Sequence, residues 1–448
     1  MQFSGFWHNY KPHFVATLIL AWPIIIGQIG QVSMGVIDTA MVGSLGEFPV
    51  AAAGAASSVF FLFTVFGFGL SSAVSPLVSM AAAKNDKAET AGILRGSYWA
   101  AVLISLIIMI LLFLVSFFFN FLKQNAEVSE MAVSYLRIII WSVLPMIVFL
   151  SVKQFADGLS FTRSSMLITL LAIPTNAFLN WLLIYGNWGM PELGLDGAGY
   201  ATLITRVFMM LAMILFVHRS KGLHSFVINK PKLVGSFTRK VFRIGVPSGF
   251  QYFFEVAAFG TAMIMAGWIG VAQQAAHQIA INTAALTYMA VTGLSAAGSI
   301  RVGAAFGGYA VREVRIAGKS AVILGAVWML LCGIGLALFR TQIAGLFIGE
   351  ADVLFWAEKL LLIAAMFQLS DGIQAIGLGI LRGISDVRIP TLITLFAYWI
   401  IGIPMAWILG FHSSLSIEGI WIGLSFALSV SAGLLYWRFN RLSRLKAE

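Results

Sequence analysis

Charged residues are scarce in this chain of 448 residues: they make up only 10% of it, whereas hydrophobic residues make up 60%. A soluble domain has about 25% charged residues, so a water-soluble fold of this composition would expose large apolar surfaces. The apolar runs are far longer than the roughly 10 residues of a barrel strand, and they do not alternate with polar residues. Because backbone groups in hydrocarbon must be hydrogen-bonded internally, the sequence predicts an all-α integral membrane protein.

Several chemical signatures are missing as well. The single cysteine, Cys332, can form no internal disulfide, and neither a cysteine cluster nor a His-Glu-x-x-His motif indicates zinc. The absence of a Walker lysine motif makes ATP an unlikely source of energy. Five of the six histidines lie at or beyond the ends of apolar segments, and His277 is expected to be a hydrogen-bonded helix residue. We therefore expect no cofactor.

Twelve apolar segments follow one another along the chain, and each is long enough to cross a bilayer. They are expected at 14–43, 50–80, 91–120, 128–152, 160–186, 196–218, 239–268, 275–303, 314–340, 353–381, 388–410 and 416–438. Prolines inside them should kink or loosen the helices, at Pro23, Pro145, Pro174, Pro247 and Pro404.

The second half of the sequence repeats features of the first. Gly69-Leu-Ser-Ser-Ala-Val-Ser75 matches Gly293-Leu-Ser-Ala-Ala-Gly-Ser299 at an offset of 224 residues, and Pro23 matches Pro247 at the same offset. An ordered series of such matches indicates two copies of one unit, a plan common among membrane transporters. Chance similarity between apolar helices is the competing interpretation.

The repeat and the charges together predict the domain organisation. We expect an N-terminal six-helix lobe at 1–220, a cytoplasmic linker at 221–238 with an amphipathic part, and a C-terminal six-helix lobe at 239–448. Of the 28 Lys and Arg residues, 23 fall in the loops and tails on the side of both termini. The positive-inside rule then places both termini in the cytoplasm. The formal charge of +10 therefore reflects topology, and no binding of nucleic acid is expected.

Three carboxylates lie inside the predicted spans: Asp38, Glu255 and Asp371. A charge at the centre of a bilayer costs about 3 kcal/mol on insertion scales, so such residues usually face a cavity and serve ions or substrates. A helix cap or a neutral, hydrogen-bonded acid at a helix break is the structural alternative. No basic residue lies nearby in the same spans, so a structural salt bridge is not expected.

Other polar side chains accompany these acids. Asp38 has candidate partners in Gln28, Gln31, Asn176, Asn180 and Thr202. The second-half candidates are Gln251, Gln278, Asn282, Thr283, Tyr288, Ser370 and Gln374, with Phe367 one turn before Asp371. A single amide more often joins two helices than binds a ligand. Several that converge on a carboxylate favour a site for a hard cation or a proton.

A set of short motifs along almost the whole chain resembles the MATE (multidrug and toxic compound extrusion) family, and within it the NorM branch. The matching pieces are Pro23 with Gln28 and Gln31, Ile37-Asp-Thr-Ala-Met-Val-Gly43, Pro174-Thr-Asn176 with Asn180, Gly194-Leu-Asp-Gly-Ala-Gly199, Ala276-His-Gln-Ile279, Ser370-Asp-Gly-Ile-Gln374 and Leu381-Arg-Gly383. Each is weak alone, but together and in order they are specific.

The resemblance implies two six-helix bundles arranged as a V, in a monomer of the bacterial inner membrane. It implies export of cationic, aromatic drugs by alternating access, driven by entry of Na⁺ or H⁺, and hence antibiotic resistance. Asp38, Asn176, Asn180 and Thr202 would form a first-half cation site. Glu255 and Asp371 would form a second-half site, which would hold Na⁺ if sodium is the coupling ion. Phe367 replaces a tyrosine that is frequent in NorM proteins, and this leaves the sodium coordination open.

Two other functions remain as alternatives. A related lipid or polysaccharide flippase would need basic residues in the spans for its anionic substrate, and Arg206 is the one clear candidate. An intramembrane aspartyl protease would need two of the acids to meet as a dyad. The duplicated halves and the missing Gly-x-Gly-Asp motif disfavour the protease, so we expect a transporter of small organic cations in the bilayer rather than an enzyme.

Overall fold

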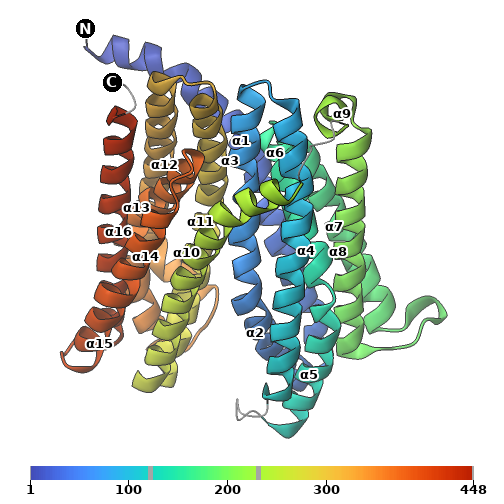
Figure 1. The fold of residues 1–448 in the computed structure, drawn as a ribbon. Helices are drawn as coiled ribbons and strands as arrows, with labels where there is room; N and C mark the ends of the chain where they lie inside the picture. Colours follow the sequence, from blue (N-terminus) through green and yellow to red (C-terminus); the bar gives the residue numbers. More distant parts are fainter. Residues whose placement is uncertain (1, 120–124, 229–233, 446–448) are drawn as a thin grey trace. The chain divides into compact units, whose positions relative to one another are not determined.

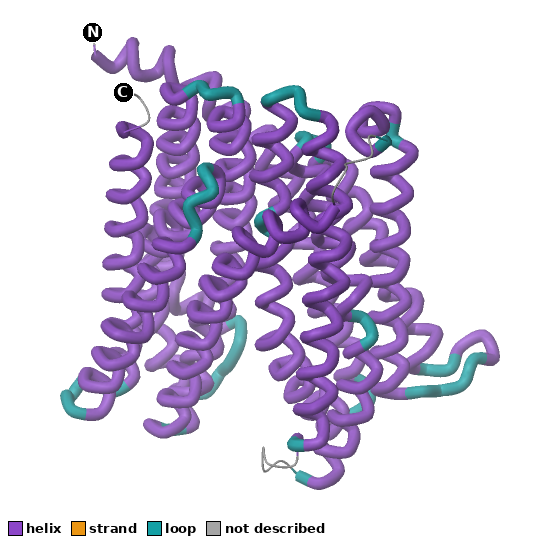
Figure 2. Tube along the Cα trace, in the orientation of Figure 1, coloured by secondary structure: helices purple, strands orange, loops and turns teal. Residues whose placement is uncertain are grey.

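The computed structural model describes residues 2–119, 125–228 and 234–445, and nearly all of these residues are helical (Figure 1, Figure 2). No strand occurs in these ranges. The prediction of an all-α protein is therefore confirmed.

The first half of the chain forms ten helical elements. They are α1 (Gln2–Gly43), α2 (Glu47–Ser71), α3 (Val74–Ala83), α4 (Lys87–Phe117), α5 (Ala126–Ile140), α6 (Val143–Gly158), α7 (Thr162–Ile184), the 3₁₀ turn η2 (Asn187–Gly189), α8 (Gly194–Arg219) and α9 (Lys221–Val227). The second half forms α10 (Val234–Ile269), α11 (Val271–Gly307), α12 (Val311–Gly345), α13 (Ala351–Gly383), α14 (Arg388–Leu395), the π-helical segment η3 (Phe396–Gly402), α15 (Ile403–Phe411) and α16 (Ile417–Leu445).

The described helices supply the predicted number of spans. Eleven stretches are long and apolar enough to cross a membrane, and the pair α5 and α6, bent by 44°, makes twelve if it counts as one span. Helices α2 and α3 share one stretch, and α14, η3 and α15 share another. All twelve predicted segments therefore correspond to observed helices.

The chain divides into two compact units. One unit contains residues 26–249, and the other contains residues 1–25 together with 250–448. In the first unit α7 packs against α8, and α4 and α8 pack against α6; in the second, α11, α12 and α16 pack against α13. The predicted lobe boundaries, 1–220 and 239–448, followed the repeat and differ from this division. As lobes that move during transport, they stay a prediction.

The predicted linker at 221–238 falls partly outside the described residues, because 229–233 are not described. Its first part is α9, in which Leu223 and Val227 are buried while Lys221 and His224 are exposed. The two buried residues are four apart and share one helix face. This stretch is therefore amphipathic, as predicted.

The backbone repeats itself between the halves at the offset seen in the sequence. Asn85 (φ 57°) and Tyr309 (φ 58°) both adopt the left-handed conformation just after a helix, and so do Ser160 (φ 68°) and Ser385 (φ 61°). In all four turns the next residue's N–H donates to a carbonyl five residues earlier, within 3.1 Å. This is a common way to satisfy the last carbonyls of a helix. The same helix ends thus recur 224 or 225 residues apart.

Two glycines at close helix contacts repeat in the same way. A Cβ atom on Gly158 would lie 2.7 Å from the carbonyl oxygen of Ser75, and one on Gly383 would lie 2.8 Å from that of Ser299. Only glycine lets α6 approach α3 this closely, and the same holds for α13 and α11. The two halves therefore share packing as well as sequence.

The first segment of each half packs with residues from the other half of the sequence. Arg301 on α11 donates from Nη1 to the carbonyl oxygen of His13 and to Thr17 Oγ1, both at 2.7 Å. At the start of α10, Lys240 forms an ion pair with Glu89 on α4. Residues 1–25 thus belong to the unit of 250–448, and residues 234–249 belong to the unit of 26–249.

Candidate functional site

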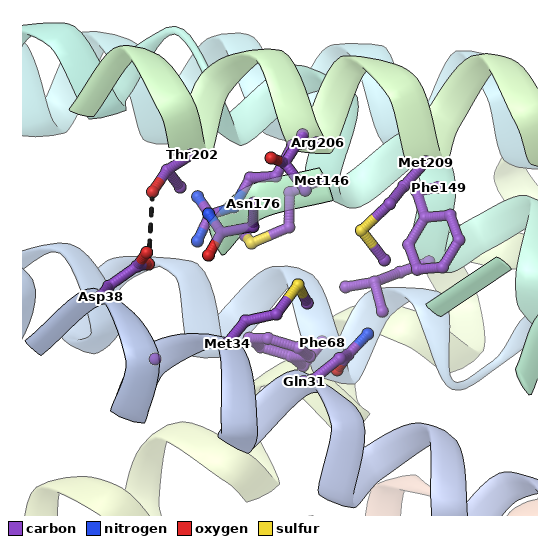
Figure 3. Close-up of a pocket in the computed structure, with 13 residues that line it drawn as sticks. Gln31, Met34, Asp38, Phe68, Met146, Phe149, Asn176, Thr202, Arg206 and Met209 are labelled. Carbon is purple, nitrogen blue, oxygen red and sulfur yellow. Dashed lines mark hydrogen bonds between the residues drawn. The ribbon is translucent and has the colours of Figure 1, made fainter. Parts of the chain in front are cut away.

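A cavity of about 200 Å³ lies inside the unit of residues 26–249 (Figure 3). Helices α1, α2, α6, α7 and α8 provide its walls. The lining residues are Gln31, Met34, Gly35, Asp38, Phe68, Met146, Phe149, Leu150, Asn176, Thr202, Thr205, Arg206 and Met209. Figure 3 shows Asp38 and Thr202 at one end and Gln31, Phe149 and Met209 towards the other. We call this cavity the first-half pocket.

Asp38 on α1 is held by side chains from α7 and α8. Asn180 donates from Nδ2 to Asp38 Oδ1 at 2.5 Å, and Thr202 donates from Oγ1 to Asp38 Oδ2 at 3.4 Å. Asn176 and Asn180 are one helical turn apart and both buried, and Asn180 Nδ2 also lies 3.4 Å from Asn176 Oδ1. Within the described residues, Asn180 Oδ1 is buried and accepts no hydrogen bond. An acceptor of this kind is available to a bound cation.

The structure therefore brings together the side chains that the sequence suggested for the first half. Asp38, Asn176, Asn180 and Thr202 form one hydrogen-bonded group, and Gln31 lines the same pocket. Their proposed role in binding a cation remains a prediction.

Arg206 is a pocket residue that the sequence reasoning considered only as a mark of a flippase. It lies one turn after Thr202 on α8, so the spacing of four residues was the available signal. Its Nη1 donates to Ser142 Oγ at 2.6 Å, and its guanidinium carbon lies 5.0 Å from the centre of the Phe60 ring. In the described part of the chain it forms no ion pair with Asp38. The pocket therefore holds two separated groups of opposite charge.

The rest of the pocket wall is largely sulfur-containing and aromatic. Met34, Met146 and Met209 line it together with Phe68 and Phe149. Methionine is flexible and polarisable, so such a wall can adapt to ligands of different shape. The individual residues could not be identified from the sequence, which contains 18 methionines and 36 phenylalanines.

Glu255 on α10 and Asp371 on α13 lie within electrostatic range of each other in the second unit. Tyr288 on α11 donates from its hydroxyl to Glu255 Oε1 at 3.3 Å. Asp371 is only 7% exposed, and no side chain in the described residues forms a hydrogen bond with it. The two predicted acids and the predicted Tyr288 are thus neighbours.

Gln374, one turn after Ser370 on α13, pairs with a tyrosine that the sequence reasoning missed. Gln374 Nε2 donates to the Tyr398 hydroxyl at 2.8 Å, which lies 3.2 Å from Gln374 Oε1. Tyr398 is fully buried in η3, the π-helical stretch two residues before Pro404. Proline cannot donate the usual helical hydrogen bond, and π-helical segments are frequent at functional sites. A tyrosine close before that proline was the available signal.

The remaining second-half candidates lie in other surroundings. Gln278 Nε2 donates to Asn282 Oδ1 at 3.0 Å, and both residues are exposed on α11. Phe367 is buried with its ring 5.8 Å from that of Trp421, whose Nε1 donates to His277 Nδ1 at 3.1 Å. His277 is therefore hydrogen-bonded, as predicted. The structure shows no contact that joins Gln278 or Asn282 to the second-half acids.

Sodium would have to rely on few charged ligands. Among the described residues, no group of three or more His, Cys, Asp or Glu side chains could hold a metal ion. Hard cations accept carboxylate, amide and hydroxyl oxygens together. Glu255, Asp371 and the Tyr288 hydroxyl are a donor set of this type, although a proton on either acid fits the same surroundings.

A protein-family comparison matches the family model described as MatE to residues 23–182 and 247–408. The chain belongs to the MATE family. The two matched stretches begin 224 residues apart, so each half contains one copy of the family's repeat. The predicted duplication and the predicted family are both confirmed, and the MATE chain is a multi-pass membrane protein.

Curated relatives agree with this assignment. A protein from Bradyrhizobium diazoefficiens named "Probable multidrug resistance protein NorM" is 35% identical, and the alignment covers 98% of this chain and 96% of that protein. A protein of the same name from Rhizobium meliloti is 34% identical, with coverage of 98% and 95%.

Solved structures confirm the fold of this MATE protein. A eukaryotic MATE transporter superposes with a TM-score of 0.90 at 20% identity, covering 98% of this chain and 99% of the other. A MATE protein in a straight conformation gives a TM-score of 0.88 at 21% identity, covering 97% of each chain. At this level of identity the similarity establishes the fold alone.

Proposed function

We propose that this MATE protein is a secondary antiporter that exports organic cations with aromatic bodies in exchange for Na⁺ or H⁺ by alternating access. The relatives named as multidrug resistance proteins support a drug substrate. The observation that most favours a cation is the position of Asp38. Its carboxyl group faces a pocket whose other walls are mainly methionine, phenylalanine and amide groups.

The first-half pocket suits the substrate because it offers one acid in apolar surroundings. A cationic amine can pair with Asp38, while the aromatic part of the substrate lies against Met34, Phe68 and Met209. Electrostatic interactions are stronger where water is excluded. Binding of a substrate cation and protonation of Asp38 would then exclude each other, which is the condition for exchange.

The second-half acids suit the coupling ion because they are close together and mostly shielded from water. Two neighbouring carboxylates repel one another, and a bound Na⁺ or a proton removes that repulsion. Tyr288 supplies a hydroxyl oxygen beside Glu255. The ion would bind here while the drug binds in the first-half pocket, so the two halves would divide the work.

We also place the protein in the bacterial inner membrane with both termini in the cytoplasm. The curated relatives are bacterial proteins, and 23 of the 28 Lys and Arg residues lie on the side of the termini.

Vesicle transport with one imposed gradient at a time tests this function. Drug uptake into inside-out vesicles should require either a sodium gradient or a pH gradient. Glu255→Gln and Asp371→Asn should each abolish the coupled uptake because each removes one of the paired charges. Asp352→Asn is a matched control, since Asp352 lies on the same helix as Asp371 but is exposed. Coupled uptake at the wild-type rate by either acid variant, at normal abundance, would contradict the proposal.

A flippase for an anionic lipid or polysaccharide is the second candidate, and the position of Arg206 in the pocket favours it. A flippase would move labelled lipid between leaflets in reconstituted vesicles and would not need Asp38. Membership of a family whose solved members are transporters supports our expectation that the chain is not an enzyme.

A further inference from the structure

An arginine inside a membrane span is costly, so its surroundings should show why it is present. Arg206 lies on α8 within a predicted span and lines the first-half pocket. Its guanidinium stacks on the Phe60 ring at 5.0 Å and makes one hydrogen bond, to Ser142 Oγ at 2.6 Å. These contacts fix the position of the side chain but use only one of its N–H donors.

A guanidinium has five N–H donors in a planar fork. In the described residues Arg206 has no hydrogen bond other than the one to Ser142 and no ion pair. An arginine that is anchored in this way, with most of its donors unused and its side chain in the wall of a cavity, is arranged to accept an anion. A carboxylate matches the fork because it can accept two parallel hydrogen bonds.

The acid of the same pocket is occupied separately. Asp38 accepts hydrogen bonds from Asn180 and Thr202 rather than from Arg206. The pocket thus offers one negative and one positive group at different places in an otherwise apolar wall. A substrate with a single positive charge pairs with Asp38 but is repelled by Arg206. A substrate with both charges can pair with each of them.

We propose that Arg206 is a specificity-determining residue that, together with Asp38, makes the first-half pocket prefer aromatic substrates that contain a carboxylate as well as a cationic nitrogen. This inference rests on the proposed export function and adds the substrate class. The alternative is that Arg206 only joins α8 to α2 and α6 through Phe60 and Ser142. A purely structural arginine would affect all substrates to the same extent.

Two fluorescent dyes test this difference because they differ only at one carboxyl group. Rhodamine 110 is zwitterionic, and rhodamine 123 is its methyl ester and therefore only cationic. We would measure initial uptake of both dyes into vesicles containing the wild-type protein, Arg206→Met or Arg206→Lys. The ratio of acid to ester uptake should fall at least tenfold in Arg206→Met and stay within about threefold of wild type in Arg206→Lys, because lysine keeps the charge.

A second variant covers the case in which Arg206→Met does not fold. Asp38→Asn should raise the ratio of acid to ester uptake, because the acid keeps its contact with Arg206 and the ester loses its only ionic contact. A ratio that does not change in either variant would overturn the inference. Wild-type uptake of the ester without the acid would overturn it too, while leaving the proposed export function intact. Uptake of neither dye would count against the proposed function and, with it, against this inference.

Discussion

Asp38→Asn is the substitution that most directly separates the two halves of the proposed mechanism. The new side chain has almost the same shape, and its oxygen can still accept the hydrogen bond from Asn180 that is 2.5 Å long in the wild type. Thr202 lies 3.4 Å from the other oxygen and can rotate its hydroxyl to accept from the new amide. We therefore expect little change in folding.

The effect on substrate binding follows from the lost charge. A hydrogen bond to a charged group contributes about 1.5–3 kcal/mol, which corresponds to a factor of roughly 10 to 150 in affinity. The dissociation constant of a purely cationic dye such as rhodamine 123 should therefore rise at least tenfold in Asp38→Asn. Binding of ²²Na⁺ or protons at Glu255 and Asp371 should remain measurable, because these acids belong to the other unit.

Dye binding to purified protein, measured by fluorescence polarisation, and ion binding to the same samples test both expectations. Asp196→Asn is the control: Asp196 belongs to the same unit and accepts from Ser134 at 2.8 Å, but it lines a different cavity. It should leave dye affinity near the wild-type value. If Asp38→Asn abolishes the same ion binding that Asp371→Asn abolishes, the two halves share one site and the division of labour is wrong.

Three further predictions concern sodium, packing and topology. If sodium is the coupling ion, Phe367→Tyr should strengthen the sodium dependence of transport by placing an oxygen one turn from Asp371; an unchanged sodium titration at fixed pH would remove this argument. Gly383→Ala should cost about 1–3 kcal/mol of stability, because the new methyl would lie 2.8 Å from a backbone oxygen. Gly335→Ala, with open space around it, should not, and thermal unfolding of the two variants compares them. Cys332→Ser leaves a chain without cysteine; cysteines then added at either terminus should resist membrane-impermeant maleimide in intact cells, and labelling of either would refute the cytoplasmic placement.

The spans and the group around Asp38 were predictable because their signals are local or strongly constrained. Long apolar runs fix the helices, and few polar residues in those runs can satisfy an isolated acid. Asn176 and Asn180 share a helix face because they are four residues apart. A polar pair on one face, opposite a single acid, leaves few arrangements.

Other features depend on how helices meet, which the sequence does not specify. Gln278 and Asn282 have the same spacing as the asparagine pair, yet they bond to each other on an exposed face of α11. Arg206 could have faced any neighbour, and only the packing of α8 places it in the pocket with Asp38. Tyr398 depends on the local π-helical geometry of η3, which changes the direction of the side chain.

The exchange of first segments between the halves has a consequence for biosynthesis. Residues 1–25 leave the ribosome first, but Arg301, which binds His13 and Thr17, is made some 280 residues later. The unit of residues 26–249 has all its parts as soon as the start of α10 has been synthesised. The beginning of α1 must instead wait in the membrane until most of the chain has been inserted. The earliest segment to be translated is thus among the last to reach its final contacts.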